Sequence, residues 1–236
     1  MQKVGFIPKS SHFCPEISRL TRLRILPLMI EELIIRTLCD TLPAKPLDGL
    51  FLFGQTEDNQ AAAFETASQL VQNKRIDKVF CLNTVPLSGY PGYAIWSKQL
   101  GLIGIGDDIL EPVPPVPAGT QLLHTRIEAE SMILHAKKQG YTHLVVTAAP
   151  FQQPRAFMTA VTLALQEYPE LYLYSMPGKA LPWQDEVTHS QGKVEDTRAG
   201  LIAGEIERIN CYHKQGDLAS VGDVLDYLNR RDKGKL

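Results

Sequence analysis

The sequence has 236 residues, of which 44% are hydrophobic and 21% charged, with 24 Lys and Arg against 26 Asp and Glu. A chain of this length and composition folds into one large domain or two small ones, with a sizeable core. Its formal net charge is -2, and residues of both signs are interspersed along the chain. The sequence therefore lacks the cluster of basic residues that binds nucleic acid or an anionic membrane surface. We therefore expect neither nucleic acid nor a membrane among its partners.

The sequence also lacks the segments that direct a chain into or across a membrane. Its most apolar stretch, residues 25–38, is short and carries Glu31, Glu32 and Arg36, which a membrane span would not tolerate. Residues 1–10 do not read as a signal peptide, because two lysines bracket only a short apolar run. These patterns predict a cytoplasmic protein.

The cysteines do not suggest a metal site or a disulfide framework. Cys14, Cys39, Cys81 and Cys211 stand far apart, and no CxxC pair occurs. We expect no metal, and we expect all four thiols to be reduced and structural. Cys81, which lies in an apolar run, should pack as a small hydrophobic side chain.

The chain begins with a helical pattern and then alternates between strand and helix. Residues 15–42 repeat apolar side chains at helical spacing, with Pro27 as an expected kink, which predicts one broken helix or two. Short apolar runs then predict strands, and longer periodic stretches predict helices. In chain order we predict strand 47–53, helix 58–73, strand 78–82, helix 92–100, a weak strand 109–113, helix 121–139, strand 141–147, helix 154–166 and strand 171–175.

This alternation predicts the fold class. Strands separated by helices pair in parallel, so we expect an α/β protein with a Rossmann-like, doubly wound, mainly parallel sheet of about five strands and helices on both faces. The proline-rich residues 112–117 should form an exposed loop, because proline cannot donate to a central ladder. Ligands of such sheets bind in a crevice at the carboxyl ends of the strands.

The pattern changes after residue 178. Residues 181–194 are polar and irregular, residues 195–215 predict a long helix, and residues 220–230 predict a shorter one. The basic residues 230–235 should form a frayed, solvated end. We expect a single domain made of an N-terminal helical segment, a Rossmann-like core and a C-terminal part that packs on the core or on a second copy, with the bounds 1–46, 47–178 and 179–236.

The end of the first predicted strand carries Gly54 and Gln55 but neither common phosphate-binding loop. Both the GxGxxG spacing and the GxxxxGK[ST] spacing are absent there, which disfavours a standard dinucleotide or P-loop site. Gly54 would permit a sharp backbone turn, and Gln55 could hydrogen-bond a ligand. The sequence is equally consistent with a glycine that only ends a strand.

The helix 121–139 brings a hydroxyl and a carboxylate towards the expected crevice. Helical spacing places Thr125 on the sheet-facing side, with Glu128 beside it. The same Thr-x-x-Glu spacing is that of a capping box. Both interpretations stay open at the level of the sequence.

Arg155 is the best single candidate for a ligand contact. It stands in the first turn of helix 154–166, where the helix dipole disfavours a cation, so it requires a nearby anion. That anion could belong to a ligand or to an acidic side chain of the protein. Catalytic residues stay unassigned, because no GxSxG elbow occurs and only His189 lies in a polar loop within reach of the crevice.

Three stretches together resemble the YdcF-like family, also described as domain of unknown function 218, which includes the SanA and ElyC proteins. They are residues 48–54, the run LHTRIEA at 123–129, and the VVT and PFQQPRA runs within 145–156. The resemblance spans residues 45–178 and implies a Rossmann-like fold without GxGxxG. It also implies an adenosyl ligand such as S-adenosylmethionine, or a related nucleotide ligand.

The family's signature Thr, acidic residue and Arg fall on Thr125, Glu128 and Arg155. Two positions depart from its pattern: residues 83–84 replace a glycine pair, and Gln152 replaces a histidine. These changes remove a close backbone approach to a phosphate or ribose, and a proton carrier. Residue patterns and resemblance together give the candidate binding residues Gly54, Gln55, Asn83, Thr84, Thr125, Glu128, Thr147, Gln152 and Arg155.

The leading hypothesis is a protein that binds an adenosyl or nucleotide-like small molecule at the carboxyl edge of its sheet, with catalysis left open. A second hypothesis is a non-catalytic interaction or regulatory module, with a vestigial crevice and a homodimer interface on the C-terminal helices. A third hypothesis is a hydrolase or transferase of cell-envelope precursors, because membrane-anchored members of the YdcF-like family are tied to envelope and murein synthesis.

Overall fold

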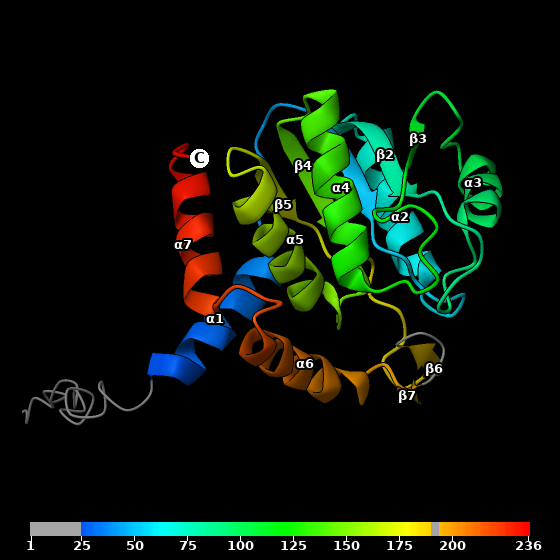
Figure 1. Ribbon diagram of the computed structural model, residues 1–236. Coiled ribbons are helices and arrows are strands. Elements are labelled where there is room, and N and C mark those ends of the chain that lie inside the picture. The colour runs from blue at the N-terminus through cyan, green and yellow to red at the C-terminus, as the bar shows by residue number, and fades with distance from the viewer. Residues whose placement is uncertain (1–24, 190–193) are drawn as a thin grey trace, which may run out of the picture.

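The computed structural model describes residues 25–189 and 194–236, arranged around one five-stranded sheet (Figure 1). The helices are α1 (Ile25–Leu38), α2 (Gln60–Gln72), α3 (Tyr93–Leu102), α4 (Thr125–Gln139), α5 (Gln153–Glu167), α6 (Leu201–Gln215) and α7 (Val221–Asp232). The strands are β1 (Leu47–Leu52), β2 (Ile76–Leu82), β3 (Leu110–Val113), β4 (His143–Thr147), β5 (Tyr172–Ser175), β6 (Glu186–His189) and β7 (Val194–Thr197).

The sheet is parallel throughout, with the strand order β3-β2-β1-β4-β5. The prediction of a Rossmann-like α/β fold is therefore confirmed. The chain runs outward from β1 to β2 and β3, and then returns to place β4 on the other side of β1. The order of strands thus reverses between β1 and β4, which is where open α/β sheets form their ligand crevice.

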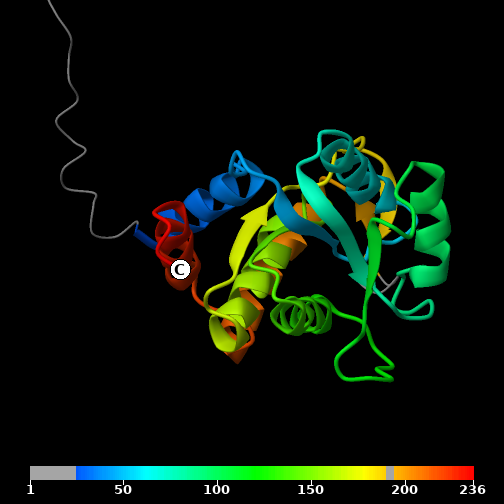
Figure 2. The ribbon, with the colours of Figure 1, turned by 90° about the horizontal axis from the view of Figure 1, so that it is seen from above.

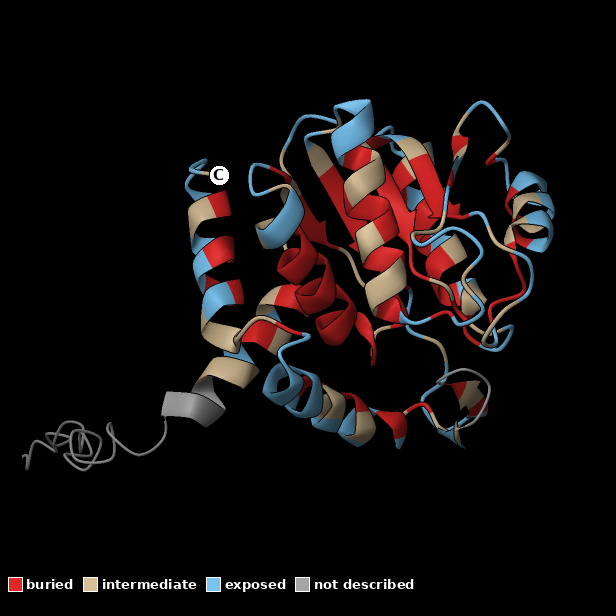
Figure 3. Ribbon diagram, viewed as in Figure 1, coloured by how far each residue is buried: buried red, intermediate tan, exposed pale blue. Residues whose placement is uncertain are grey.

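Helices cover both faces of the sheet, with α2 on one face and α4 and α5 on the other (Figure 2). Helix α5 is buried continuously from Gln153 to Ala164. It packs on β4 and β5 and is also contacted by α1, α4, α6 and α7. Buried residues consequently run along most of this helix (Figure 3). The tight packing gives the side chains that project from α5 a rigid base.

The core helices follow the predicted pattern, with one difference at the start of α4. Helix α4 begins at Thr125 instead of residue 121, because His124 has an extended backbone with φ -145° and ψ 161°. Pro27 lies within the described part of α1. Residues 15–24 of the predicted N-terminal helix lie outside the described residues.

The predicted helices that end at residues 215 and 230 are present as α6 and α7, but the predictions for residues 181–200 are wrong. Residues expected to be irregular form β6, which pairs antiparallel with β7, and β7 occupies the start of the predicted helix 195–215. The sequence of β7, Val-Glu-Asp-Thr, is polar and poorly buried, so no hydrophobic alternation reveals it. Arg198 holds the hairpin in place by donating to Asn59 Oδ1 at 2.9 Å and to the Asp58 carbonyl at 2.7 Å.

A glycine carries the chain from β5 towards this hairpin. The Gly178 N–H donates to the Ala148 carbonyl at 2.8 Å, and the Lys179 N–H donates to the Ala62 carbonyl at 2.9 Å. A Cβ at position 178 would lie 2.9 Å from the carbonyl carbon of Ala62, a distance that side chains do not tolerate. Glycine therefore lets this segment cross the carboxyl edge of the sheet in contact with the ends of β4 and α2.

Contrary to the prediction of a frayed, solvated C-terminal end, Arg231 is only 4% exposed. Its guanidinium donates to both carboxylate oxygens of Asp40, at 2.6 and 2.7 Å, and to the Leu173 carbonyl at 2.8 Å. It also lies 4.7 Å from the centroid of the Tyr174 ring. This buried ion pair joins α7 to β5 and to the residues that follow α1.

The cysteines differ in their surroundings. Cys81 is buried in β2, as predicted, and burial raises the pKa of its thiol to about 12. Cys39 and Cys211 are free but exposed, so the prediction that they are structural is wrong: one follows the end of α1 and the other lies on the solvent side of α6. Cys14 lies outside the described residues.

None of the helices described here is long and apolar enough to cross a membrane.

We expect Asp40→Asn to lower the free energy of unfolding by about 3 kcal/mol, because it leaves the Arg231 charge buried without its main counter-charge. Urea unfolding of the purified protein measures this change. The matched control is Asp226→Asn on α7, the helix that carries Arg231. The exposed pair of Asp226 with Arg230 at 3.1 Å should contribute no more than about 0.5 kcal/mol. Equal effects of the two substitutions would show that burial of the Asp40 pair does not matter.

Candidate functional site

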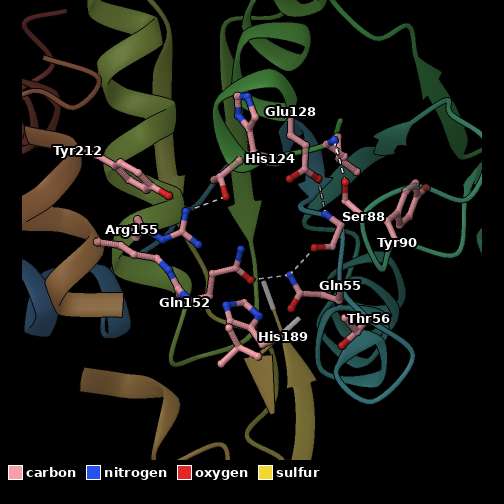
Figure 4. Close-up of a pocket in the computed structure, with 15 residues that line it drawn as sticks. Gln55, Thr56, Ser88, Tyr90, His124, Glu128, Gln152, Arg155, His189 and Tyr212 are labelled. Carbon is pink, nitrogen blue, oxygen red and sulfur yellow. Dashed lines mark hydrogen bonds between the residues drawn. The ribbon is translucent and has the colours of Figure 1, made fainter. Parts of the chain in front are cut away.

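A cavity of about 310 Å³ opens at the carboxyl ends of β1 and β4, where the strand order reverses (Figure 4). The segments after these two strands line it, together with the start of α4, the loop after β2, strand β6 and helix α6. Of the predicted binding residues, the structure brings six into this lining: Gly54, Gln55, Thr125, Glu128, Gln152 and Arg155.

Glu128 extends into the cavity from the first turn of α4 (Figure 4) and is 3% exposed. Its Oε1 accepts a hydrogen bond of 2.5 Å from the Gly54 N–H. A Cβ at position 54 would lie only 2.9 Å from that oxygen, so Gly54 does more than end β1: it makes room for the carboxylate.

The buried position of Glu128 changes its acidity. Burial raises the pKa of Glu128 to about 7, against the smaller lowering effects of the Gly54 N–H and the Arg155 charge. A substantial fraction of this carboxyl group therefore holds a proton near neutral pH. At that pH it is able either to donate or to accept a hydrogen bond.

Arg155 lines the same cavity from α5, and its anion is a side chain of the protein. Its Nε donates to Glu205 Oε2 at 2.5 Å, and its Nη2 donates to Glu205 Oε1 at 3.3 Å. Its Nη1 donates to Thr125 Oγ1 at 2.8 Å. The guanidinium is therefore fixed in one orientation by α4 and α6 while it faces the cavity.

Thr125 does not form the capping box that its sequence permits. His124 is the N-cap residue of α4, and no side-chain hydrogen bond caps this helix. The Thr125 hydroxyl accepts from Arg155 instead. The capping-box interpretation is therefore wrong, because the helix begins one residue too early for Thr125 to act as its cap.

Glu205, which the sequence analysis missed, is the centre of the charged groups at the site. It is 2% exposed and bonds to Arg155, to Arg208 Nη1 at 2.5 Å and to His189 Nε2 at 2.9 Å. Burial alone would raise the pKa of Glu205, but the Arg155 charge and the hydrogen bonds from His189 and Arg155 outweigh it and lower the pKa to about 2. We call Arg155, His189, Glu205 and Arg208 the Glu205 cluster.

A sequence signal for Glu205 does exist. The buried residues of α6 are Leu201, Glu205 and Ile209, which stand four apart on one face of the helix. A carboxylate in the middle of an apolar stripe requires a buried partner. The mistaken start of this helix at residue 195 hid the short stripe within a longer polar segment.

Two glutamine side chains form a bridge between the ends of β1 and β4. Gln55 Nε2 donates to Gln152 Oε1 at 2.9 Å, and both residues are buried. The side chain of Gln152 is an uncharged amide, and it occupies this part of the cavity wall. The pair supplies hydrogen-bonding groups without adding charge.

Aromatic and hydroxyl side chains complete the lining. His189 comes from β6, a strand instead of the predicted loop, and its ring lies edge-on to Phe151 with centroids 5.0 Å apart. Tyr90, Ser88 and Tyr212 were not predicted. Burial raises the pKa of Tyr90, whose hydroxyl donates to the Leu82 carbonyl at 3.1 Å.

The remaining predicted residues, Asn83, Thr84 and Thr147, are not part of the cavity lining. Asn83 is exposed, and the loop that it begins runs towards α3, where the Tyr93 N–H donates to the Thr84 carbonyl at 2.9 Å. Thr147 is fully buried at the end of β4, and its hydroxyl has no hydrogen-bond partner among the residues that the structure describes. A position near a strand end in the sequence is therefore not enough to place a residue in the cavity lining, because its side chain must also face the crevice.

We expect Glu128→Gln to change how stability depends on pH. A carboxyl group with a raised pKa stabilises the folded protein below its unfolded pKa of 4.5, and this contribution is lost as pH rises to about 7. Unfolding by urea at several pH values should therefore show that the variant gains about 3 kcal/mol relative to the original protein between these limits. A difference that stays constant with pH would contradict the raised pKa.

Within the described parts of the chain, no group of three or more His, Cys, Asp or Glu side chains is placed to hold a metal ion. The sequence matches no protein-family model, and no curated protein shows significant sequence similarity to it. The resemblance to the YdcF-like family stays a prediction, and the geometry of the site carries the functional argument.

Proposed function

We propose that the protein binds an adenosyl or nucleotide-like small molecule with an anionic group, of the S-adenosylmethionine type, in the cavity between the ends of β1 and β4. One observation carries this proposal. At the point where the strand order reverses, the guanidinium groups of Arg155 and Arg208 share the single carboxylate of Glu205. The cluster therefore has positive charge available for a ligand carboxylate or phosphate.

The two arginines suit different tasks in such a site. Arg155 is buried and held by Thr125 and Glu205, so it offers a fixed direction for a charge-assisted hydrogen bond. The Arg208 side chain is 25% exposed, so it has room to turn towards an anion. The size of the cavity lies at the lower end of the roughly 300–1,000 Å³ that is usual for small-molecule sites.

The neutral groups suit the sugar or the polar atoms of such a ligand. Glu128 accepts from Gly54 through one oxygen, while the other points towards the space in front of Arg155 (Figure 4). Hydroxyl groups of a ribose both donate and accept hydrogen bonds, as a half-protonated carboxyl and the Gln55–Gln152 pair do. These groups would orient the ligand after its anionic group has been captured.

A reaction at this site is a second candidate function, favoured by one observation. A carboxyl group with a pKa of about 7, such as that of Glu128, is suited to give or take a proton at neutral pH. Hydrolysis or transfer on an envelope precursor would use such a group. The structure assigns no nucleophile, so binding remains the better-supported proposal.

The alternative of an interaction module receives less support from the surface of the C-terminal helices. Of the large hydrophobic side chains that the structure shows as exposed, α6 carries Ile202 and Tyr212 and α7 carries none. The apolar residues of α7 pack on α1 and α5 instead. A homodimer through these helices and a cytoplasmic location stay predictions.

We expect a selective rise in thermal midpoint when the purified protein is scanned with adenosyl compounds, nucleotides and sugar nucleotides. A ligand at 100 times its dissociation constant stabilises the folded state by about 2.7 kcal/mol. Arg208→Gln should remove most of this shift, because it removes the more exposed cation of the Glu205 cluster while leaving Arg155 paired with Glu205. Arg155→Lys should also reduce it, because lysine cannot keep the Thr125 and Glu205 contacts together.

Arg230→Gln is the matched control, since Arg230 is an exposed arginine of α7 outside the cavity lining. This control should retain the full shift. The proposal fails if no anionic compound of the panel raises the midpoint, or if the control loses as much of the shift as Arg208→Gln.

A further inference from the structure

A second cavity, of about 210 Å³, lies beside the first and shares part of its wall. We call the cavity already described the first chamber and this one the second chamber. The shared residues are His124, Thr125, Arg155 and Tyr212. The second chamber is lined in addition by Arg126, Thr159, Asp217 and Leu218, so it lies between α4, α5 and the end of α6.

The second chamber differs from the first in its charge. Arg126 donates to the Asp217 carbonyl at 2.9 Å and lies 3.8 Å from the Asp217 carboxylate. The charges of Arg126 and Asp217 therefore compensate each other. Arg155, on the boundary, is paired with Glu205. Burial and the nearby Arg126 charge lower the pKa of His124, so this ring is neutral at neutral pH. No free cation here would attract the anionic group of a ligand.

The residues of the second chamber suit a flat ring instead. Tyr212 extends from α6 towards Arg155 (Figure 4) and keeps 36% of its surface exposed, although it is a large aromatic residue. The His124 ring and the Leu218 side chain contribute further surface with little charge. Half-exposed aromatic side chains of this kind provide faces on which planar bases stack.

We propose that the second chamber holds an aromatic ring of the ligand whose anionic group lies in the first chamber, with Arg155 and Thr125 at the boundary. This inference rests on the proposed function and assigns the ring of its ligand to a separate subsite. The ligand is then a two-part molecule that joins a phosphate or carboxylate to a planar ring. Either part alone would fill only one chamber and bind more weakly.

The experiment compares two probes that differ by the ring, AMP and ribose 5-phosphate, by isothermal titration calorimetry. We expect AMP to bind the unmodified protein at least about tenfold more tightly. Tyr212→Ala, which removes the ring surface, and Thr159→Leu, which fills a position that lines only the second chamber, should each weaken AMP binding about tenfold. Binding of ribose 5-phosphate should stay within about twofold in Thr159→Leu, and in Tyr212→Ala it should weaken clearly less than AMP binding, because Tyr212 also lines the first chamber.

Two further variants serve as controls. Tyr212→Phe keeps the ring and should keep most of the AMP affinity. Ile202→Ala removes another exposed hydrophobic side chain of α6 that lines neither chamber, and should change neither affinity. Thermal midpoints of all variants report whether they fold. If Thr159→Leu does not fold, Tyr212→Ala decides the outcome, because Tyr212 is partly exposed.

The outcomes separate this inference from the proposed function. Equal affinity for the two probes, or equal weakening of both by Tyr212→Ala, would overturn the second chamber as a ring site while leaving anion binding in the first chamber intact. If neither probe binds the unmodified protein and the wider panel also fails, the proposed function and this inference fall together.

Discussion

The ion pair between Arg155 and Glu205 is the interaction on which the rest of the site depends. Moving two charges out of water costs several kcal/mol for each ion, and their attraction offsets this only if their other bonding positions are filled. Here Thr125 accepts a hydrogen bond from Arg155 Nη1, and His189 and Arg208 bond to Glu205. Helix α6 buries only Leu201 and Ile209 besides Glu205, so this pair is one of three contacts that hold α6 over the carboxyl edge of the sheet.

The site contains two buried carboxyl groups with opposite behaviour. Glu205 is surrounded by cations and ionises with a pKa of about 2, whereas Glu128 has mainly burial around it and a pKa of about 7. Environments that move the pKa values of two carboxyl groups in opposite directions are typical of sites that need one fixed charge and one mobile proton. The cavity therefore keeps a permanent electrostatic framework while one of its walls changes charge near neutral pH.

The sheet and its helices could be predicted from sequence because their signals are local and strong. The strands of the core are short apolar runs, and α5 has Pro154 at its start. That same regularity predicted the crevice and placed Gly54, Glu128 and Arg155 near it. Polar strands such as β6 and β7 have no comparable sequence signal. The sequence also does not indicate which residue pairs with a buried charge.

The features that sequence reasoning missed share a physical origin. Arg231 and Glu205 are charged residues whose burial depends on segments remote in sequence, so a rule that places charges at the surface fails for both. The direction of a side chain at a strand end is also decided by tertiary packing, which is why Thr147 is buried while Gln152 lines the cavity. Pattern alone locates the edge of the sheet but does not choose which side chains face the crevice.

The order of the chain gives the Arg155–Glu205 pair a further consequence. Glu205 lies 50 residues after Arg155, and every strand of the parallel sheet precedes it. A ribosome that synthesises the chain from its N-terminus therefore releases the sheet and its arginine before the counter-charge exists. We expect the nascent chain to carry an unneutralised cation at its crevice until α6 emerges, so the binding site matures only after the whole parallel sheet has been synthesised.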